Sequence, residues 1–114
     1  MAVHNGIALY DIGLGGCLTG VYANEQDPQA GRVFNEIARR KSPTDDPQNI
    51  EGIYEAMYFE WGANHHGELH IKKVHGTNNV FDVVWILDGS AKPDYVGKGY
   101  ILKPHVFVVH YESN

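Results

Sequence analysis

The sequence predicts a mainly β protein that closes as an eight-stranded antiparallel up-and-down barrel. Short runs of β-branched and aromatic residues recur along the chain, separated by Gly, Asn, Asp and Pro. From Glu68 onward, apolar and polar residues alternate with the period that is typical of half-buried strands. Eight such runs joined in sequence order are enough to close a barrel, which removes exposed strand edges. A chain of 114 residues supports one core, so residues 1–114 form a single predicted domain.

The first two runs predict a β-hairpin. Residues 6–12 and 17–23 are rich in apolar and aromatic side chains, and Gly13, Gly15 and Gly16 lie between them. Glycine supplies the positive φ angles that tight turns need. The order Gly-Leu-Gly-Gly lacks the spacing of a dinucleotide-binding or P-loop motif, so we do not predict a phosphate site here.

Residues 32–39 are ambiguous between strand and helix. The preceding Asp27-Pro28 is typical of a helix start, and the apolar residues that follow recur with helical spacing. As a strand the segment alternates poorly, because Glu36 falls on the same face as apolar side chains. Local signals favour a helix over residues 28–40.

Residues 52–61 present the same choice. A strand beginning at Gly52 has the aromatic density that strands favour, and both of its faces are largely apolar. Glu, Ala and Met favour a helix instead, although a glycine in its interior costs about 1 kcal/mol. The alternative fold is therefore α+β, with two helices at 28–40 and 47–61 packed on a curved antiparallel sheet.

The remaining runs are predicted strands. Leu69 and Ile71 face inward in one of them, and Trp85 lies on the apolar face of the next. Gly97 and Gly99 share a face, a spacing that suits a sharply curved strand or one crossed by a bulky neighbour. The eight predicted strands cover residues 6–12, 17–23, 32–39, 52–61, 68–74, 80–87, 95–102 and 105–111.

Aromatic and glycine residues punctuate these strands in a way that carries a family resemblance. The features concerned are Leu18-Thr-Gly-Val-Tyr22, Gly52-x-Tyr54, Trp61 and Trp85 in successive predicted strands, and Tyr95-Val-Gly-Lys-Gly. With them, most of the chain resembles the small calycin-like barrels, the class that holds the avidins and lipocalins. The resemblance implies a barrel whose interior can hold one small ligand. No residue set matches the biotin-contacting pattern of avidins or the amino-terminal Gly-x-Trp of lipocalins, so no binding residue is carried over.

Composition and charge restrict the partners. The formal net charge of −5 argues against a nucleic-acid surface, which needs a basic stripe. No apolar run approaches the length of about 18 residues that a membrane span needs, and the amino terminus lacks a secretory signal. Cys17 is the only cysteine, so no internal disulfide forms. We expect a cytoplasmic protein without nucleic-acid or membrane partners, with a processed secreted form as the alternative.

The seven histidines raise the question of a metal site. His65, His66 and His70 fall within one predicted hairpin beside Glu68, and imidazole and carboxylate groups are zinc ligands. Adjacent strand residues point to opposite faces, however, which separates these side chains. We predict no metal site and no cofactor.

The aromatic residues point to a cavity or a subunit contact. Seven tyrosines and two tryptophans combine apolar rings with hydrogen-bonding tips, which suits a pocket better than a plain packed core. The predicted function is a barrel that binds an apolar or aromatic small molecule in its interior, without catalytic residues. The residues predicted to line the ligand site are Tyr54, Met57, Phe59, Trp61, Trp85, Tyr100 and His110.

Two other functions stay open. One is a homo-oligomeric (dimeric) interaction module, in which the doubly apolar strands 80–87 and 105–111 pack against a second copy. The other is an α+β cone-type enzyme, in which histidine and a carboxylate perform acid–base chemistry. The sequence identifies neither a ligand nor a substrate, and it does not tell whether the interior is hollow.

Overall fold

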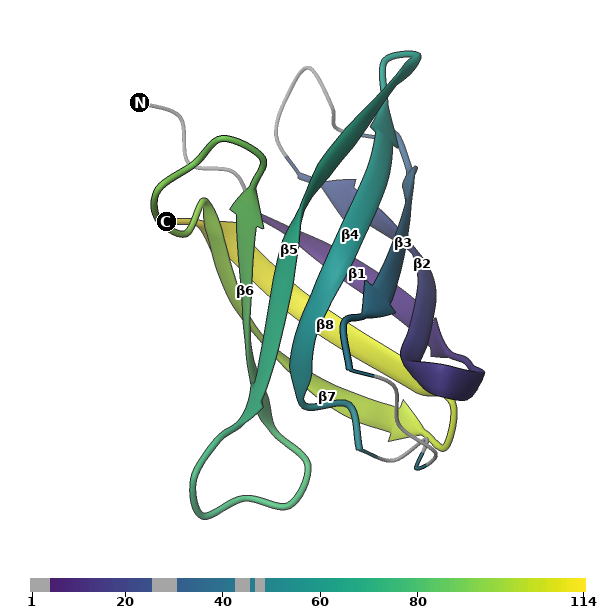
Figure 1. Ribbon diagram of the computed structural model, residues 1–114, viewed down its shortest axis with the longest axis vertical. Helices are drawn as coiled ribbons and strands as arrows, with labels where there is room; N and C mark the ends of the chain where they lie inside the picture. Colours follow the sequence, from purple (N-terminus) through teal and green to yellow (C-terminus); the bar gives the residue numbers. More distant parts are fainter. Residues whose placement is uncertain (1–4, 26–30, 43–45, 47–48) are drawn as a thin grey trace.

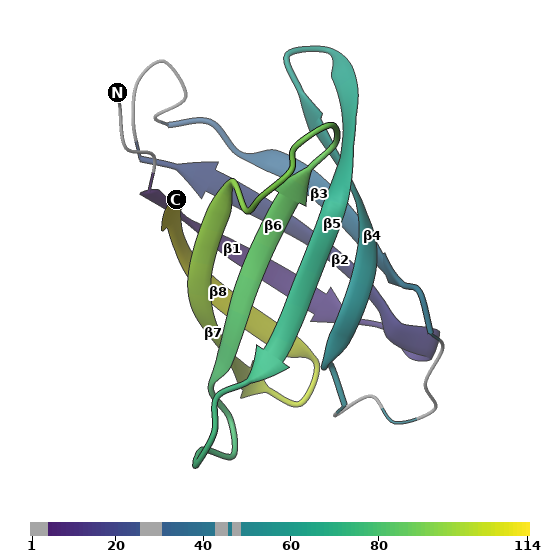
Figure 2. The ribbon, with the colours of Figure 1, turned by 60° about the vertical axis from the view of Figure 1, so that its left-hand side comes forward.

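The computed structural model describes residues 5–25, 31–42, 46 and 49–114. Within them, eight strands follow one another around a closed barrel, each antiparallel to its neighbours, and β8 returns to pair with β1 (Figures 1 and 2). The prediction of an eight-stranded antiparallel up-and-down barrel is confirmed. The strands are β1 (Asn5–Ile12), β2 (Cys17–Asn24), β3 (Phe34–Arg40), β4 (Gly52–Glu60), β5 (Ala63–Lys73), β6 (Phe81–Leu87), β7 (Tyr95–Lys103) and β8 (Val106–Ser113), with a short 3-10 helix, η1 (Leu14–Gly16), between β1 and β2.

Both segments that were open to a helical interpretation are strands. The alternative α+β fold, with helices at 28–40 and 47–61, is wrong for the described residues, because β3 and β4 pair with each other and with a second neighbour each. Residues 28–30 and 47–48 lie outside the described part of the chain. Pairing on both sides satisfies the backbone N–H and C=O groups of these strands, and this long-range gain outweighs a local helical preference.

One end of the barrel is filled with apolar side chains. Leu18, Leu69 and Phe107 are fully buried there, and Ile50 is buried beneath them from the connection before β4. The Tyr54 hydroxyl donates a 2.7 Å hydrogen bond to the Ile50 carbonyl, which fixes that connection against the core. Burying one large apolar side chain stabilises a fold by about 1.5–3 kcal/mol. We call this the closed end; η1 and the connections β3–β4, β5–β6 and β7–β8 lie there.

The opposite end, which we call the open end, carries the β2–β3, β4–β5 and β6–β7 connections. The β4–β5 hairpin projects from it, far from the β5–β6 loop (Figures 1 and 2). Glu60 pairs with Ala63, so the turn consists of Trp61 and Gly62 alone, and both have positive φ angles, 53° and 77°. These are the backbone angles of the tight hairpin turns that match strand twist. Trp61, predicted as the last strand residue, therefore lies in the turn.

Two predicted features of the later strands are confirmed. Leu69 and Ile71 of β5 point inward, as does the apolar face of β6 that carries Trp85. Gly97 also faces inward, and a Cβ atom built there would lie 2.4 Å from the His110 carbonyl oxygen. Glycine is thus required where the backbone of β8 approaches its neighbour β7 closely.

We predict that Gly97→Ala destabilises the fold by about 1–3 kcal/mol, because the added methyl group collides with backbone rather than with a movable side chain. Urea denaturation followed by circular dichroism measures the change. The control is Lys98→Ala, one residue along β7, where the side chain is exposed and forms only a surface ion pair with Asp82. Equal stability of the two variants contradicts the prediction.

Candidate functional site

The open half of the barrel encloses a cavity of about 120 Å³. Its walls come from every strand except β5, because side chains at alternate positions of each strand point inward. Aromatic rings and carboxylates share this lining, whereas the packing at the closed end is apolar. The lining residues are Ala8, Tyr22, Asn24, Glu36, Tyr58, Glu60, Trp85, Leu87, Tyr95 and Tyr111.

Glu36 is the buried acidic group of this cavity. Its side chain is 5% exposed and accepts a 3.3 Å hydrogen bond from the Trp85 indole nitrogen. The Tyr10 hydroxyl lies near the carboxylate but is buried without a hydrogen-bond partner of normal geometry. Burial raises the pKa of Glu36 to about 7, although the nearby Tyr10 and Trp85 favour the ionised form. The carboxyl can therefore gain or lose a proton near neutral pH.

Two further polar pairs lie around the cavity. The Tyr22 hydroxyl donates a hydrogen bond to Glu60 Oε2, and the Tyr111 hydroxyl donates one to Asn24 Oδ1. Burial, together with the neighbouring carboxylate of Glu60, raises the pKa of Tyr22 well above its ordinary range. Burial also raises the pKa of Tyr58 to about 12. These hydroxyls stay neutral and act as hydrogen-bonding groups on an otherwise aromatic wall.

The aromatic rings of the lining contact one another mostly edge to face. The Trp85 and Tyr111 ring centroids are 5.3 Å apart at 62°, and Tyr95 meets Tyr111 at 5.9 Å and 88°. On the other side, Tyr22 lies 6.4 Å from Tyr58 at 75°. Such pairs hold one another in position while leaving ring faces for other contacts. The His65 ring stacks on Tyr58 at 5.1 Å, at the hairpin that rises beside the open end.

Two of the predicted ligand residues lie inside the barrel. Trp85 is 7% exposed and forms part of the cavity wall. Tyr54 is also buried, but it belongs to the filled core at the closed end and does not border the cavity. The structure therefore does not bring the two together in one site.

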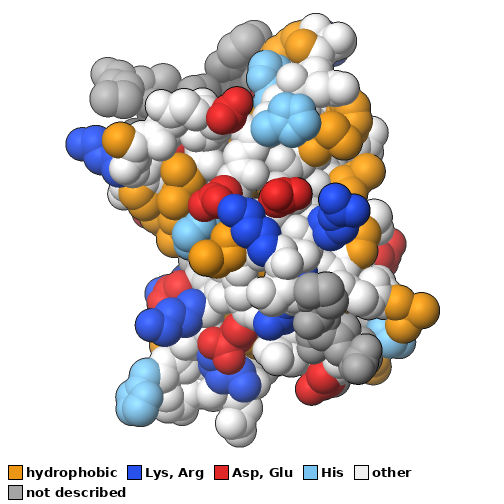
Figure 3. All heavy atoms as spheres, in the orientation of Figure 1, with side chains coloured by type: hydrophobic (Ala, Val, Ile, Leu, Met, Phe, Trp, Pro, Cys, Tyr) orange, Lys and Arg blue, Asp and Glu red, His pale blue; other side chains and the backbone are white. Residues whose placement is uncertain are grey.

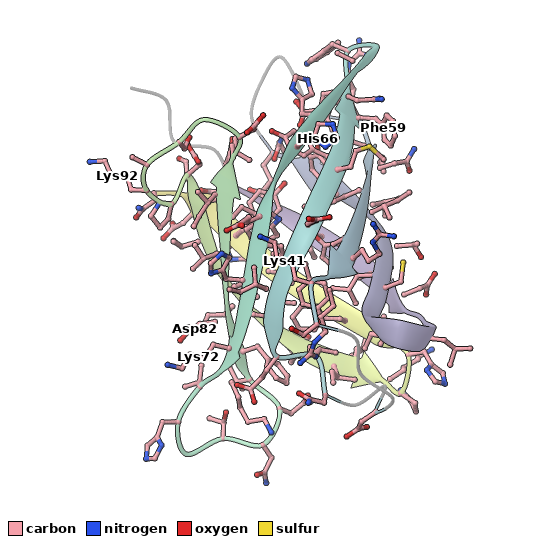
Figure 4. All side chains as sticks on the ribbon, viewed as in Figure 1. Lys41, Phe59, His66, Lys72, Asp82 and Lys92 are labelled. Atoms are coloured by element: carbon pink, nitrogen blue, oxygen red, sulfur yellow. The ribbon has the colours of Figure 1, made fainter. Side chains whose placement is uncertain are left out.

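The other five predicted residues do not line the interior. Strand parity explains the two on β4: the even-numbered residues Tyr54 to Glu60 point inward, so Met57 and Phe59 point out. Figure 4 shows Phe59 directed away from the barrel. Trp61 lies in the β4–β5 turn, where the Arg32 guanidinium stands 4.7 Å above its ring. Thus five of the predicted residues lie outside the cavity: Met57, Phe59, Trp61, Tyr100 and His110.

The same alternation separates His65 from His66 and His70, which share the outer face of β5. His65 stacks on an inward tyrosine, His66 is exposed, and His70 lies 3.0 Å from Glu68 on the outer face. Among the residues that the structure describes, no group of three or more His, Cys, Asp or Glu side chains is arranged to hold a metal ion.

A larger hollow of about 540 Å³ lies on the outer surface, along β4 and β5. Two of its charged groups, Lys41 and Glu68, already pair with each other, and Glu68 also contacts His70. Figure 3 shows basic and acidic side chains interspersed over this face, and Figure 4 places Lys41 and His66 on it. Such exposed ion pairs contribute little to stability, and salt readily screens them. The interior cavity is therefore the better candidate for a specific site.

Sequence reasoning missed the acidic centre of the cavity. Glu60 borders the cavity from β4. Glu36 lies on a segment whose local signals favoured a helix, so no inward orientation was expected for it. The available signal was the alternation of Phe34, Glu36 and Ala38, which placed a carboxylate on a face with two apolar residues.

Comparison with family models, with curated proteins and with solved structures finds no match to this chain. In the part of the chain that the structure describes, no helix has the length and apolar character to cross a membrane.

The raised pKa of Glu36 predicts a pH-dependent stability. A raised carboxyl pKa means that the folded state holds its proton more tightly than the unfolded state, so the contribution of Glu36 to stability is greatest below about pH 4.5 and is lost as pH rises to about 7. The loss is about 3 kcal/mol, at about 1.4 kcal/mol per pKa unit. We expect Glu36→Gln to flatten this decline in urea denaturation at pH 5–8, whereas Glu55→Gln, on the outer face of β4, keeps it. Parallel profiles for Glu36→Gln and the unsubstituted chain would refute the assignment.

Proposed function

We propose that the protein is a small-molecule-binding barrel that takes its ligand into the cavity at the open end. One observation carries this proposal: the closed half of the interior is filled by its own side chains, whereas the other half is hollow and lined by aromatic rings with polar tips. Concave, mostly apolar sites with a few placed polar groups are typical of small-molecule binding. Here the apolar surface comes from Trp85 and the tyrosine rings, and the polar groups are Glu36, Glu60 and Asn24.

The cavity volume limits the ligand to a single-ring size. A cavity of about 150 Å³ accommodates benzene, so one of about 120 Å³ that is open at one side suits one ring with a short substituent. The calycin-like assignment belongs to this proposal. It is supported by the closed eight-stranded antiparallel barrel with all neighbours joined in sequence order.

We predict that Leu87→Trp, which places a larger side chain at the cavity wall, abolishes the binding of single-ring fragments. The test titrates a panel of neutral, cationic and anionic benzyl compounds by calorimetry. At least one class is expected to bind saturably and to shift the Trp85 indole N–H resonance, which Trp61→Phe distinguishes from the other indole signal. Leu102→Trp is the matched control, since Leu102 is 54% exposed and lies outside the cavity lining. Equal loss in both variants, or no binding by any class, contradicts the proposal.

A second function, self-association, is favoured by the outer face of β1–β4. The strand register brings Leu9 opposite Val21 and Ile37 opposite Met57, and Phe59 lies two residues further along β4, on the same face as Met57. Leu9, Val21, Ile37 and Phe59 are each between 36% and 44% exposed, so this apolar surface faces solvent. Contiguous apolar patches on a surface mark interaction sites. We place the proposed dimer contact here rather than on 80–87 and 105–111.

We predict that the protein elutes with twice its chain mass of 12.7 kDa and that Ile37→Lys shifts it to the monomer mass. The added ammonium group would stand unpaired in the buried centre of the contact. Size-exclusion chromatography with light scattering measures both masses. Val80→Lys, also on the surface but outside this patch, should leave the dimer intact. If the unsubstituted chain has the monomer mass at every concentration across the micromolar range, self-association is wrong.

A further inference from the structure

The cavity lining, all of it within the described part of the chain, carries the carboxylates of Glu36 and Glu60 and no Lys, Arg or His side chain. A buried carboxylate is stable in its charged form only when an opposite charge or several hydrogen bonds compensate it. Glu36 receives the indole N–H of Trp85 at 3.3 Å, while the Tyr10 hydroxyl beside it lacks a partner of normal geometry. The site thus has room for a positively charged group at Glu36.

The ring faces around Glu36 offer a second kind of attraction to the same charge. Trp85 lies against the carboxylate, with Tyr111 5.3 Å from it and Tyr95 next in line. Tyr58 and Tyr22 close the opposite wall. The quadrupole of a Trp or Tyr ring gives its faces a negative electrostatic potential, and these faces attract cations most strongly when water is excluded. Carboxylate and aromatic rings therefore favour one charge sign in the ligand.

We propose that this cavity selects a small organic cation, with its charged nitrogen at Glu36 and its apolar part against the tyrosine and tryptophan rings. The inference rests on the proposed ligand-binding function and narrows it from single-ring compounds in general to amines and ammonium compounds. Neutral compounds of the same shape gain the apolar contacts alone. Anionic compounds meet two carboxylates and are rejected.

Cation binding in this cavity depends on the protonation of Glu36. The groups that face it from the other strands are Tyr10, Tyr22, Tyr58, Tyr111 and Glu60, and the tyrosines stay neutral because burial raises the pKa of each of them. Since burial raises the pKa of Glu36 to about 7, its carboxyl is largely ionised at pH 8 and largely protonated at pH 6. Affinity for a permanently charged or protonated ligand should therefore fall as pH decreases.

The test uses three single-ring compounds of similar size that differ in charge: benzylamine, benzyl alcohol and benzoate. In calorimetric titrations of the full chain at pH 8, benzylamine is expected to bind at least about tenfold more tightly than benzyl alcohol, and benzoate more weakly than both. If benzyl alcohol or benzoate binds as tightly as benzylamine, the cavity is a ligand site but its preference for cations is wrong. If none of the three binds in a manner that Leu87→Trp abolishes, the ligand site itself is wrong.

Glu36→Gln separates charge from shape. We expect it to weaken benzylamine binding about tenfold or more while benzyl alcohol binding stays within about twofold, because the amide keeps the volume and loses the charge. Glu55→Gln on the outer face is the matched control and should change neither affinity. Unchanged benzylamine binding in Glu36→Gln overturns the inference.

The pH dependence provides a measurement that needs no change at Glu36. Between pH 8 and pH 6, where benzylamine stays protonated, its affinity should fall about tenfold, and that of benzyl alcohol should not. His65→Asn should keep this decline, since His65 contacts the Tyr58 ring rather than the carboxylate. A pH-independent affinity, or a decline that disappears in His65→Asn, overturns the role of Glu36.

Discussion

The burial of the Glu36 carboxylate is the constraint on which the open half of the barrel depends. Without a basic side chain among the residues around the cavity, the carboxylate needs polar neighbours, and Trp85 and Tyr10 come from β6 and β1 to provide them. Aliphatic side chains in their place would leave a buried charge with no compensation. This requirement explains why the half of the interior around Glu36 is built from tyrosine and tryptophan and holds a cavity, whereas the other half is packed with Leu, Ile, Val and Phe.

The two halves of the barrel therefore perform different tasks. At the closed end, Ile50 and Tyr54 join the connection before β4 to the core, and the apolar contacts there stabilise the fold. Because stability comes from that end, the open end can tolerate a hollow and a carboxyl whose pKa burial raises. Buried polar groups that lower the stability of the fold are typical of functional sites.

Strands whose two faces differ in polarity were predictable from the sequence. The later strands satisfy that condition, and the inward positions of Leu69, Ile71 and Trp85 followed from alternation alone. Segment 52–61 is apolar on both faces, so its sequence does not show which residues point inward; only pairing with β3 and β5 decides it. This is why Tyr58 was passed over in favour of Met57 and Phe59.

The sequence favoured a helix at β3 for a different reason. Its inward face carries Glu36 between Phe34 and Ala38, and this carboxylate breaks the alternation by which a strand is recognised. Glu36 thus disturbs the alternation of β3 and also gives the cavity its acidic character. A polar residue at a position where the strand pattern requires an apolar one indicates a functional site, but this can be recognised only when the neighbouring strands are known.

The position of Cys17 offers a practical means of orienting the molecule. It is the only cysteine, it is partly exposed, and it begins β2 opposite Arg39 at the closed end. The first and last strands, in contrast, meet at the open end, where Asn5 pairs with Glu112. A thiol-coupled surface, spin label or fluorophore at Cys17 therefore holds the barrel with its cavity facing away from the point of attachment.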